Sequence, residues 1–163
     1  MNYIDLTLQN LEDEKIKDSF ENILKHNKND VIVILGSPGS GKTSILKKFN
    51  NKNKELSSFI KVKDFLKFDI PNNEILLLDG LDEYRSLEND KVFVVTELGN
   101  RLSKLKYKKV VISCRELDWY GDTDKNSLMA QIQSNVSIYK VCPLSYKEQI
   151  ELSSLLDISN HKS

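Results

Sequence analysis

The sequence predicts an α/β fold in which a mostly parallel, five-stranded sheet carries helices on both of its faces. Short apolar runs rich in Val, Ile and Leu alternate along the chain with segments whose apolar residues recur every three or four positions. The apolar runs are continuous, as is typical of strands that are buried on both faces of a parallel sheet. Strands that alternate with helices favour such a sheet, because each crossover connection places a helix against it.

The expected elements divide the chain into three parts. Residues 1–30 are expected to form an N-terminal helical lead-in whose helix covers 12–27. Residues 31–143 form the core, and residues 144–163 begin a helical lid that opens with a capping box, Ser145 followed by Glu148. The core is expected to contain strands at 31–35, 59–62, 75–79, 110–114 and 136–141, and helices at 42–49 and 92–105.

Composition and charge exclude several classes of protein. The 163 residues carry 24 basic and 24 acidic side chains, so no overall field attracts nucleic acid or an anionic membrane surface. The lysine clusters at 47–54 and 104–109 are therefore interpreted as solvated faces. The stretch MNYIDLTLQNLEDE lacks the basic and apolar regions of a signal peptide, so none is expected there. No apolar run approaches the roughly 20 residues of a spanning helix, and the cysteines lack metal or redox spacing. We therefore expect a cytoplasmic protein with no membrane partner.

The stretch GSPGSGKTS lies between the first apolar strand and the helix that follows it. It fits the pattern G-x-x-x-x-G-K-S/T through Gly36, Gly41, Lys42 and Thr43. Glycines let the backbone wrap closely around phosphates, and the helix that follows adds its positive N-terminal end. In such a loop the lysine reaches the β- and γ-phosphates, and the threonine hydroxyl coordinates Mg²⁺. The predicted phosphate-binding residues are Gly36, Ser37, Pro38, Gly39, Ser40, Gly41, Lys42, Thr43 and Ser44.

The stretch ILLLDGLDE is an apolar run that leads directly into Asp79, Asp82 and Glu83. Carboxylates are rarely buried without a positive partner, so the end of this strand should face a cation. Beside a phosphate-binding loop, an Asp at a strand end holds Mg²⁺ together with the loop threonine. We therefore expect Asp79 and Thr43 to serve the metal. Asp82 and Glu83 lie further out, where either could orient and deprotonate the attacking water.

The nucleotide is expected to be ATP. Guanine-specific proteins use the motif N-K-x-D to read the base, because selecting guanine requires hydrogen bonds to its edge. The string NKND does occur at 27–30, but it precedes the first core strand and has no DxxG partner. An LSGG signature of ABC-type ATPases is absent, and Gly80 stands where AAA+ proteins usually place a glutamate. The expected ligands are therefore ATP and Mg²⁺.

Three motifs together resemble a known family. LLLDGLDE resembles the Walker B motif of NACHT-type P-loop NTPases, in the STAND class of signal-transduction ATPases. VVISCR, which ends in Arg115, resembles the family's sensor 1, and Trp119 follows it as an aromatic does in bacterial members. PLSYKEQIELSSLL is similar to the passage from the nucleotide-binding core into the helical lid. The resemblance covers about residues 30–157 and implies that Arg115 detects the γ-phosphate. Carried over by position, it implies phosphate binding for Gly36–Ser44, Mg²⁺ binding for Asp79 and hydrolysis for Asp82 and Glu83.

The same resemblance implies a molecular switch, in which ATP exchange drives homo-oligomerisation and slow hydrolysis resets the protein, for example in antiviral defence signalling. Family members usually continue into a winged-helix domain and a sensor region. Because this chain stops at Ser163, we expect a truncated piece or a minimal protein, with an unknown sensor ligand. Two alternatives stay open: a motor-type, AAA-like ATPase acting on protein or nucleic acid, and a nucleotide-binding fragment that is inactive alone.

Overall fold

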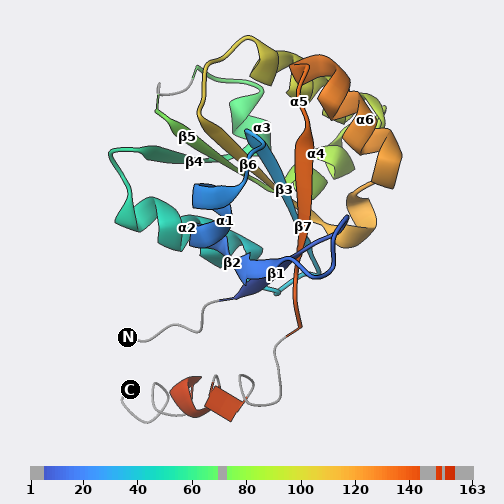
Figure 1. Cartoon of the computed structure of the whole chain (residues 1–163). Coiled ribbons are helices and arrows are strands. Elements are labelled where there is room, and N and C mark those ends of the chain that lie inside the picture. The colour runs from blue at the N-terminus through green and yellow to red at the C-terminus, as the bar shows by residue number, and fades with distance from the viewer. Residues whose placement is uncertain (1–5, 70–72, 144–149, 152, 157–163) are drawn as a thin grey trace.

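The computed structural model describes residues 6–69, 73–143, 150–151 and 153–156 (Figure 1). Its centre is a seven-stranded sheet in the order β2-β1-β7-β3-β6-β5-β4. The strands from β7 to β4 in this order are parallel to their neighbours. They are β3 (Val31–Gly36), β4 (Ser57–Lys61), β5 (Ile75–Asp79), β6 (Lys109–Arg115) and β7 (Val136–Val141).

An antiparallel hairpin extends the sheet beyond β7. Its strands are β1 (Thr7–Asn10) and β2 (Lys17–Ser19), and β1 also pairs antiparallel with β7. The five predicted strands are all present. The prediction of a five-stranded sheet was nevertheless wrong, because this hairpin adds two further strands. Neither hairpin strand has the apolar pattern of the core strands, so only their pairing, β2 with β1 and β1 with β7, identifies them.

The lead-in is consequently less helical than predicted. The helix expected over 12–27 is shortened to α1 (Phe20–His26), and residues 17–19 belong to β2. Two polar side chains account for the difference. The Asn10 carboxamide oxygen accepts hydrogen bonds from the amides of Glu12 and Asp13 and turns the chain back. The Ser19 hydroxyl caps the amide of Asn22, so that the helix begins directly after it.

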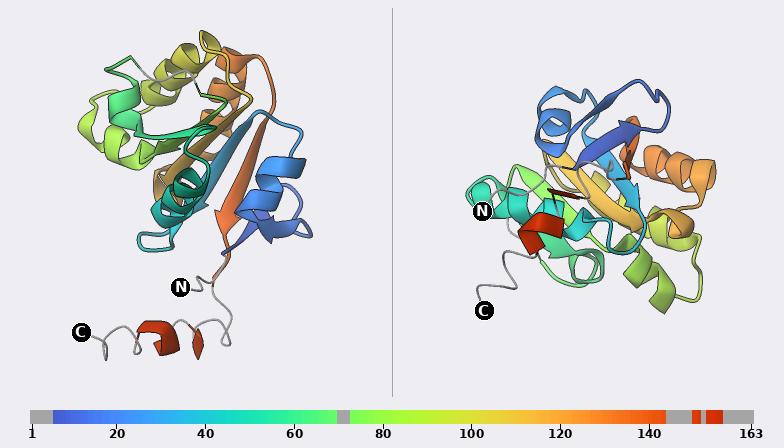
Figure 2. Two further views of the ribbon diagram at one scale, coloured as in Figure 1. Left: turned by 90° about the vertical axis from the view of Figure 1, so that its left-hand side faces the viewer. Right: turned by 90° about the horizontal axis from the view of Figure 1, so that it is seen from below.

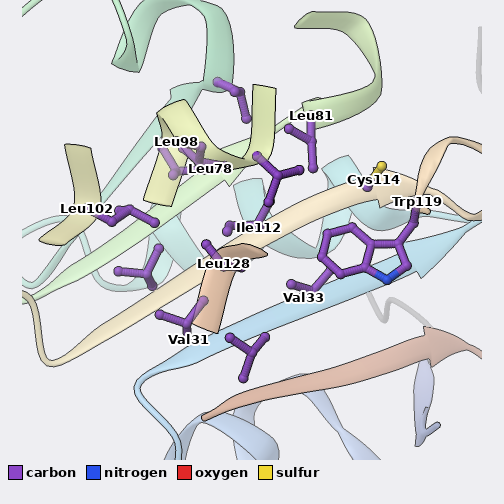
Figure 3. Packing of buried hydrophobic residues seen from close by; sticks show 14 of the residues in the cluster. Val31, Val33, Leu78, Leu81, Leu98, Leu102, Ile112, Cys114, Trp119 and Leu128 are labelled. Carbon is purple, nitrogen blue, oxygen red and sulfur yellow. The ribbon is translucent and has the colours of Figure 1, made fainter. Parts of the chain in front are cut away.

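Helices cover both faces of the sheet and give a three-layer arrangement (Figure 2). One face carries α1 and α2 (Lys42–Lys52), which pack on a buried cluster that includes Ile32 and Ile34. The other face carries the core shown in Figure 3, which includes Val31, Val33 and Trp119. Continuous burial of β3 on both faces explains its uninterrupted apolar sequence. The helices of the second face are α3 (Val62–Phe65), α4 (Leu81–Leu87), α5 (Phe93–Ser103) and α6 (Gly121–Ile132).

Both predicted core helices are present, α2 with the predicted start and a later end, and α5 slightly shortened at both ends. Helices α3, α4 and α6 and a short 3₁₀ turn at Glu116–Asp118 were not predicted. The capping box at Ser145 and Glu148 lies outside the described residues. Within the described part of the chain, none of the helices combines the length and apolar character that crossing a bilayer would require.

Candidate functional site

The sheet register gathers the predicted site residues at one edge. Gly36, at the end of β3, is paired with Arg115 at the end of β6. On the far side of β6, Asp79 at the end of β5 is paired with Lys61 at the end of β4. Because the carboxyl ends of parallel strands meet at the same edge, the loop after β3 and the acids after β5 converge there.

The loop between β3 and α2 folds tightly around its own lysine. The Lys42 ammonium donates hydrogen bonds to the carbonyl oxygens of Gly36 at 2.7 Å and Ser37 at 3.0 Å. A Cβ atom placed on Gly36 would lie 2.4 Å from the Ser40 hydroxyl oxygen and 3.3 Å from two carbons of the Lys42 side chain, so a larger residue here would require both side chains to move. Gly41 precedes α2 with a φ of 99°, a left-handed conformation that favours glycine. The carbonyl oxygens hold the Lys42 ammonium against the loop, and this cation is the group that could pair with a phosphate.

A second cluster lies at the first turn of α2. The Thr43 hydroxyl is 3.0 and 3.1 Å from the two carboxylate oxygens of Asp79. The Ser113 hydroxyl, from β6, which lies between β3 and β5, donates to the Asp79 carboxylate at 2.7 Å and accepts from the amide of Gly80 at 3.0 Å. Asp79 is only 3% exposed. Hydroxyl and carboxylate oxygens are the ligands that Mg²⁺ prefers, so Thr43 and Asp79 fit this metal.

The strand and the helix that carry the acids are joined by one sharp turn. Gly80 has a φ of 81° and lies directly before α4, which lets the chain leave β5 and enter the helix within a single residue. Asp82 and Glu83 therefore lie in the first turn of α4. This turn gives a structural reason for the glycine after Asp79 in the DGLDE stretch.

The two outer acids have different partners. One carboxylate oxygen of Asp82 accepts a hydrogen bond from the backbone amide of Arg115 at 3.1 Å. Glu83 forms an ion pair with Lys61, whose ammonium lies 3.2 and 3.3 Å from its two oxygens. The same ammonium lies 3.9 Å from Asp79. Lys61 thus faces both the predicted metal-binding acid and one predicted catalytic acid.

The charges of this edge also act on one another. Burial is the largest influence on Lys42 and lowers the pKa of its ammonium, while the carboxylates of Asp82 and Asp79 act in the opposite direction. The Arg115 guanidinium adds to the lowering. Arg115 forms an ion pair with Asp118, in which Nε of Arg115 lies 3.6 Å from Oδ2 of Asp118. The structure therefore brings Arg115 into the electrostatic surroundings of Lys42, and its sensing role stays a prediction.

Sequence reasoning missed three contributions to this edge. Ser113 is a polar residue inside an apolar strand, which is a usable signal because a buried hydroxyl needs partners. Lys61 lies within the strand expected over 59–62 and is the last residue of β4, but nothing in the sequence indicates that β4 lies beside β5. The third is a buried ion pair between Arg85 and Asp124, 39 residues apart.

Neither a protein-family model nor a curated protein matches the sequence. AMPPCP-bound DnaA from Aquifex aeolicus is a similar solved structure, with a TM-score of 0.50, 17% identity, and coverage of 81% of this chain and 46% of that chain. The Holliday junction branch migration motor RuvB from Thermotoga maritima has a TM-score of 0.46 and 14% identity over 84% and 47% of the two chains. PCH-2 from C. elegans has a TM-score of 0.43 and 18% identity over 85% and 42%.

The chain thus spans less than half of the length of these structures. The likeness to DnaA concerns the fold and confirms the prediction of a three-layer α/β P-loop NTPase fold. The narrower resemblance to NACHT-type proteins stays a prediction.

Proposed function

We propose that this chain is a nucleotide-binding domain that binds Mg-ATP and hydrolyses it slowly in the service of a molecular switch. The observation that carries the proposal is the contact between the Thr43 hydroxyl and the Asp79 carboxylate, 3.0 Å apart beside the loop that holds the Lys42 ammonium. Two residues predicted as metal ligands from motifs 36 positions apart lie against each other. Such a contact is expected in a site that binds a nucleotide with Mg²⁺. A glycine-rich turn that binds no ligand gives no reason to expect it.

Each residue has a defined task in this proposal. Lys42 and the amides of its loop bind the phosphates, since a charged donor gives a stronger hydrogen bond than a neutral one. Thr43 and Asp79 would hold Mg²⁺, which supplies neutralisation of phosphate charge when it is bound. Glu83 accepts the proton of the attacking water, and Asp82 holds the Arg115 segment beside it through the backbone amide.

Placement of the NKND string supports ATP over GTP. Residues 27–30 precede β3, whereas the phosphate-binding loop follows it, so the two lie at opposite ends of the same strand. The side-chain amide nitrogen of Asn27 donates a hydrogen bond to the Tyr139 hydroxyl at 2.9 Å, and that of Asn29 donates to the Ser137 hydroxyl at 2.8 Å. These contacts give the asparagines a structural task on β7 and leave no guanine-reading role for them at the phosphate loop.

The switch part of the proposal rests on the DGLDE stretch and on Arg115 at the tip of β6. In a switch, exchange of ATP changes the assembly of the protein, and hydrolysis returns it to the resting state. We infer that the ATP-bound form assembles as a homo-oligomer and that a separate sensor ligand triggers the exchange. A switch hydrolyses ATP at a low basal rate, whereas a motor turns over continuously when it is stimulated.

The test measures binding and hydrolysis separately. Calorimetry with Mg-ATP should show that Lys42→Ala lowers affinity about 10- to 150-fold, the equivalent of about 1.5–3 kcal/mol for a charged hydrogen bond. Lys52→Ala, on the exposed end of the same helix, is the matched control and should bind as the parent does. Equal dissociation constants for Lys42→Ala and the parent would rule out the phosphate-binding assignment.

Single-turnover hydrolysis then tests the catalytic acid. Glu83→Gln keeps the shape of the side chain and removes the base, so the rate should fall about 10²- to 10⁴-fold while ATP affinity is unchanged. Glu74→Gln is the control, because Glu74 is equally exposed and precedes β5 at the opposite edge of the sheet. If Glu83→Gln hydrolyses ATP at the parent's rate, either Asp82 is the base or the hydrolysis proposal is wrong.

A further inference from the structure

Arg85 and Asp124 form an ion pair in the interior of the molecule. Two guanidinium nitrogens of Arg85 donate to the two carboxylate oxygens of Asp124, at 2.7 and 2.8 Å. Arg85 is 1% exposed and Asp124 is fully buried. Neither residue belongs to the phosphate loop or to the acids of the candidate site. A buried ion pair contributes little net stability compared with apolar residues of similar volume, so its presence calls for another explanation.

Arg85 is also the centre of a wider set of contacts. Its guanidinium donates to the carbonyl oxygens of Lys91 at 2.9 Å and Asp118 at 2.6 Å, and it lies 4.0 Å from the centre of the Tyr120 ring. The Asp124 carboxylate accepts a further bond from the Tyr120 amide at 2.7 Å. Three of these contacts hold the segment 115–120, which joins β6 to α6.

Helix α4 therefore holds this segment at two points. Asp82, in the first turn of α4, accepts from the amide of Arg115, and Arg85, three residues later, donates to the carbonyl of Asp118. Positions three apart lie on the same side of a helix. Asp118 also pairs through its side chain with the Arg115 guanidinium. Arg85 thereby completes a ring of contacts that passes through the predicted sensor and one predicted catalytic acid.

Helix α6 is held in place by apolar contacts with α5, so the ion pair is not required to keep it on the sheet. Leu98 and Gly99 of α5 pack against Leu128 and Gln131 of α6. Leu128 is fully buried in the main core (Figure 3). The ion pair acts instead on the short segment between β6 and α6, where Arg115 lies.

We propose that Arg85 and Asp124 are positioning residues for the candidate site, which fix Arg115 relative to Asp82 and Glu83 and thereby set the rate of hydrolysis. This inference rests on the proposed function. Neither side chain contacts the phosphate loop, so the pair should leave ATP affinity unchanged. Misplacement of a catalytic group by about 1 Å is enough to cost roughly 10²-fold in rate.

The decisive variant is the double substitution Arg85→Met/Asp124→Leu. Removing one partner alone would leave a buried, unpaired charge and endanger folding, whereas the double change replaces the pair with apolar side chains of similar size. Arg85→Lys is the conservative variant, because it keeps the charge and loses the two-pronged geometry. Arg101→Met is the control, since Arg101 lies on α5 and donates to the carbonyl of Phe68 away from this segment.

Trp119 supplies a readout that does not depend on hydrolysis. It is the only tryptophan of the chain, is 8% exposed and lies within the segment that the pair holds. Acrylamide quenching of its fluorescence should be weak in the parent and in Arg101→Met. It should increase in the double variant, and to a smaller extent in Arg85→Lys.

The expected result is a split between rate and affinity. The double variant should bind Mg-ATP within about 3-fold of the parent and hydrolyse it about 10- to 100-fold more slowly in single-turnover experiments. A folded double variant with the parent's rate and the parent's quenching would overturn the proposal, and so would a loss of affinity that matches the loss of rate. A parent that binds ATP without hydrolysing it would end the hydrolysis proposal. The quenching comparison would then decide alone whether the pair positions the segment.

Discussion

Cys114 lies at the end of β6 with its thiol in the interior, next to the residues that form the candidate site. Burial raises the pKa of this thiol to about 12, and the neighbouring Asp82 carboxylate acts in the same direction while the Arg85 guanidinium opposes it. An unfolded chain would release the same proton near pH 9. The protein should therefore keep Cys114 as a neutral thiol under all ordinary conditions, and a thiolate reaction is not expected there.

This difference predicts a loss of stability in alkaline solution. Above pH 9 the unfolded chain gives up the Cys114 proton and the folded chain retains it, so rising pH favours unfolding by about 1.4 kcal/mol per unit until about pH 12. Urea denaturation at pH 8 and pH 10 measures the effect. The parent should lose roughly 1 kcal/mol more than Cys114→Ala between the two pH values. Burial also raises the pKa of Tyr84 and of Tyr107, but both tyrosines are present in the two proteins and cancel in the comparison.

At the scale of residues, the sequence predicted the contacts that depend on strand ends and could not predict those that depend on strand order. Thr43 and Asp79 were expected to serve one Mg²⁺, because an Asp at a strand end lies beside the loop threonine in P-loop folds, and their side chains are 3.0 Å apart. The pairing of Lys61 with Glu83 depends on β4 lying beside β5, which no local pattern encodes. Asp124 was missed for a similar reason, since a carboxylate in a polar stretch gives no sign that it is fully buried.

Among the helices, α5 and α6 pack most closely where α5 carries a glycine. A Cβ atom at Gly99 would lie 2.7 Å from the Cβ of Gln131 and 3.3 Å from a methyl carbon of Leu128. The first neighbour is fixed to its own backbone and cannot move aside as the end of a flexible side chain can. The small residue therefore sets the distance between these two helices.

Substituting this glycine should separate the two helices. In an exposed helix, Gly→Ala stabilises by about 0.5–1 kcal/mol, but overpacking costs about 1–3 kcal/mol, so Gly99→Ala should lower the free energy of unfolding by about 1–2 kcal/mol. Asn100→Ala is the control, since Asn100 is exposed on the same helix and its replacement should change stability by less than about 0.5 kcal/mol. Chemical denaturation of the three proteins gives the comparison. A Gly99→Ala variant more stable than the parent would contradict the packing described for α5 and α6.

Helices and strands with a strong apolar pattern could be predicted from the sequence. Those whose formation depends on contacts with other elements could not. β3, β5 and β6 are built on apolar runs, β4 contains only Phe59 and Ile60 as apolar residues, and α2 and α5 show helical spacing. Helix α6 escaped prediction because only Asp124 and Leu128 are buried along it, which leaves no apolar stripe. The helix predicted over 12–27 wrongly included the hairpin turn and β2, because polar turn and cap residues decide the path of this segment, and β1 was not predicted.

For the molecule as a whole, ligand binding should appear as resistance to unfolding. A ligand at 100 times its dissociation constant stabilises the folded state by about 2.7 kcal/mol, which corresponds to roughly 5–10 °C in the melting temperature of a domain of this size. Mg-ATP should therefore raise the melting temperature of the parent and of Lys52→Ala by this amount. Under the same conditions Lys42→Ala should show a much smaller shift. An equal shift in all three proteins would place the nucleotide somewhere other than the phosphate-binding loop.

The order of the strands has a consequence for how the protein emerges from the ribosome. β3, which leads into the phosphate loop, pairs only with β6 and β7, and β1 pairs with β2 and β7. β3 must therefore wait until residues 109–141 have left the exit tunnel before the sheet around the loop can close, whereas β1 can pair with β2 earlier. Until then an apolar strand is exposed, and contacts of such long sequence separation form slowly. Nascent chains that stall between residues 60 and 110 should need chaperones, because they carry the complete phosphate-binding sequence without the two strands that shelter it.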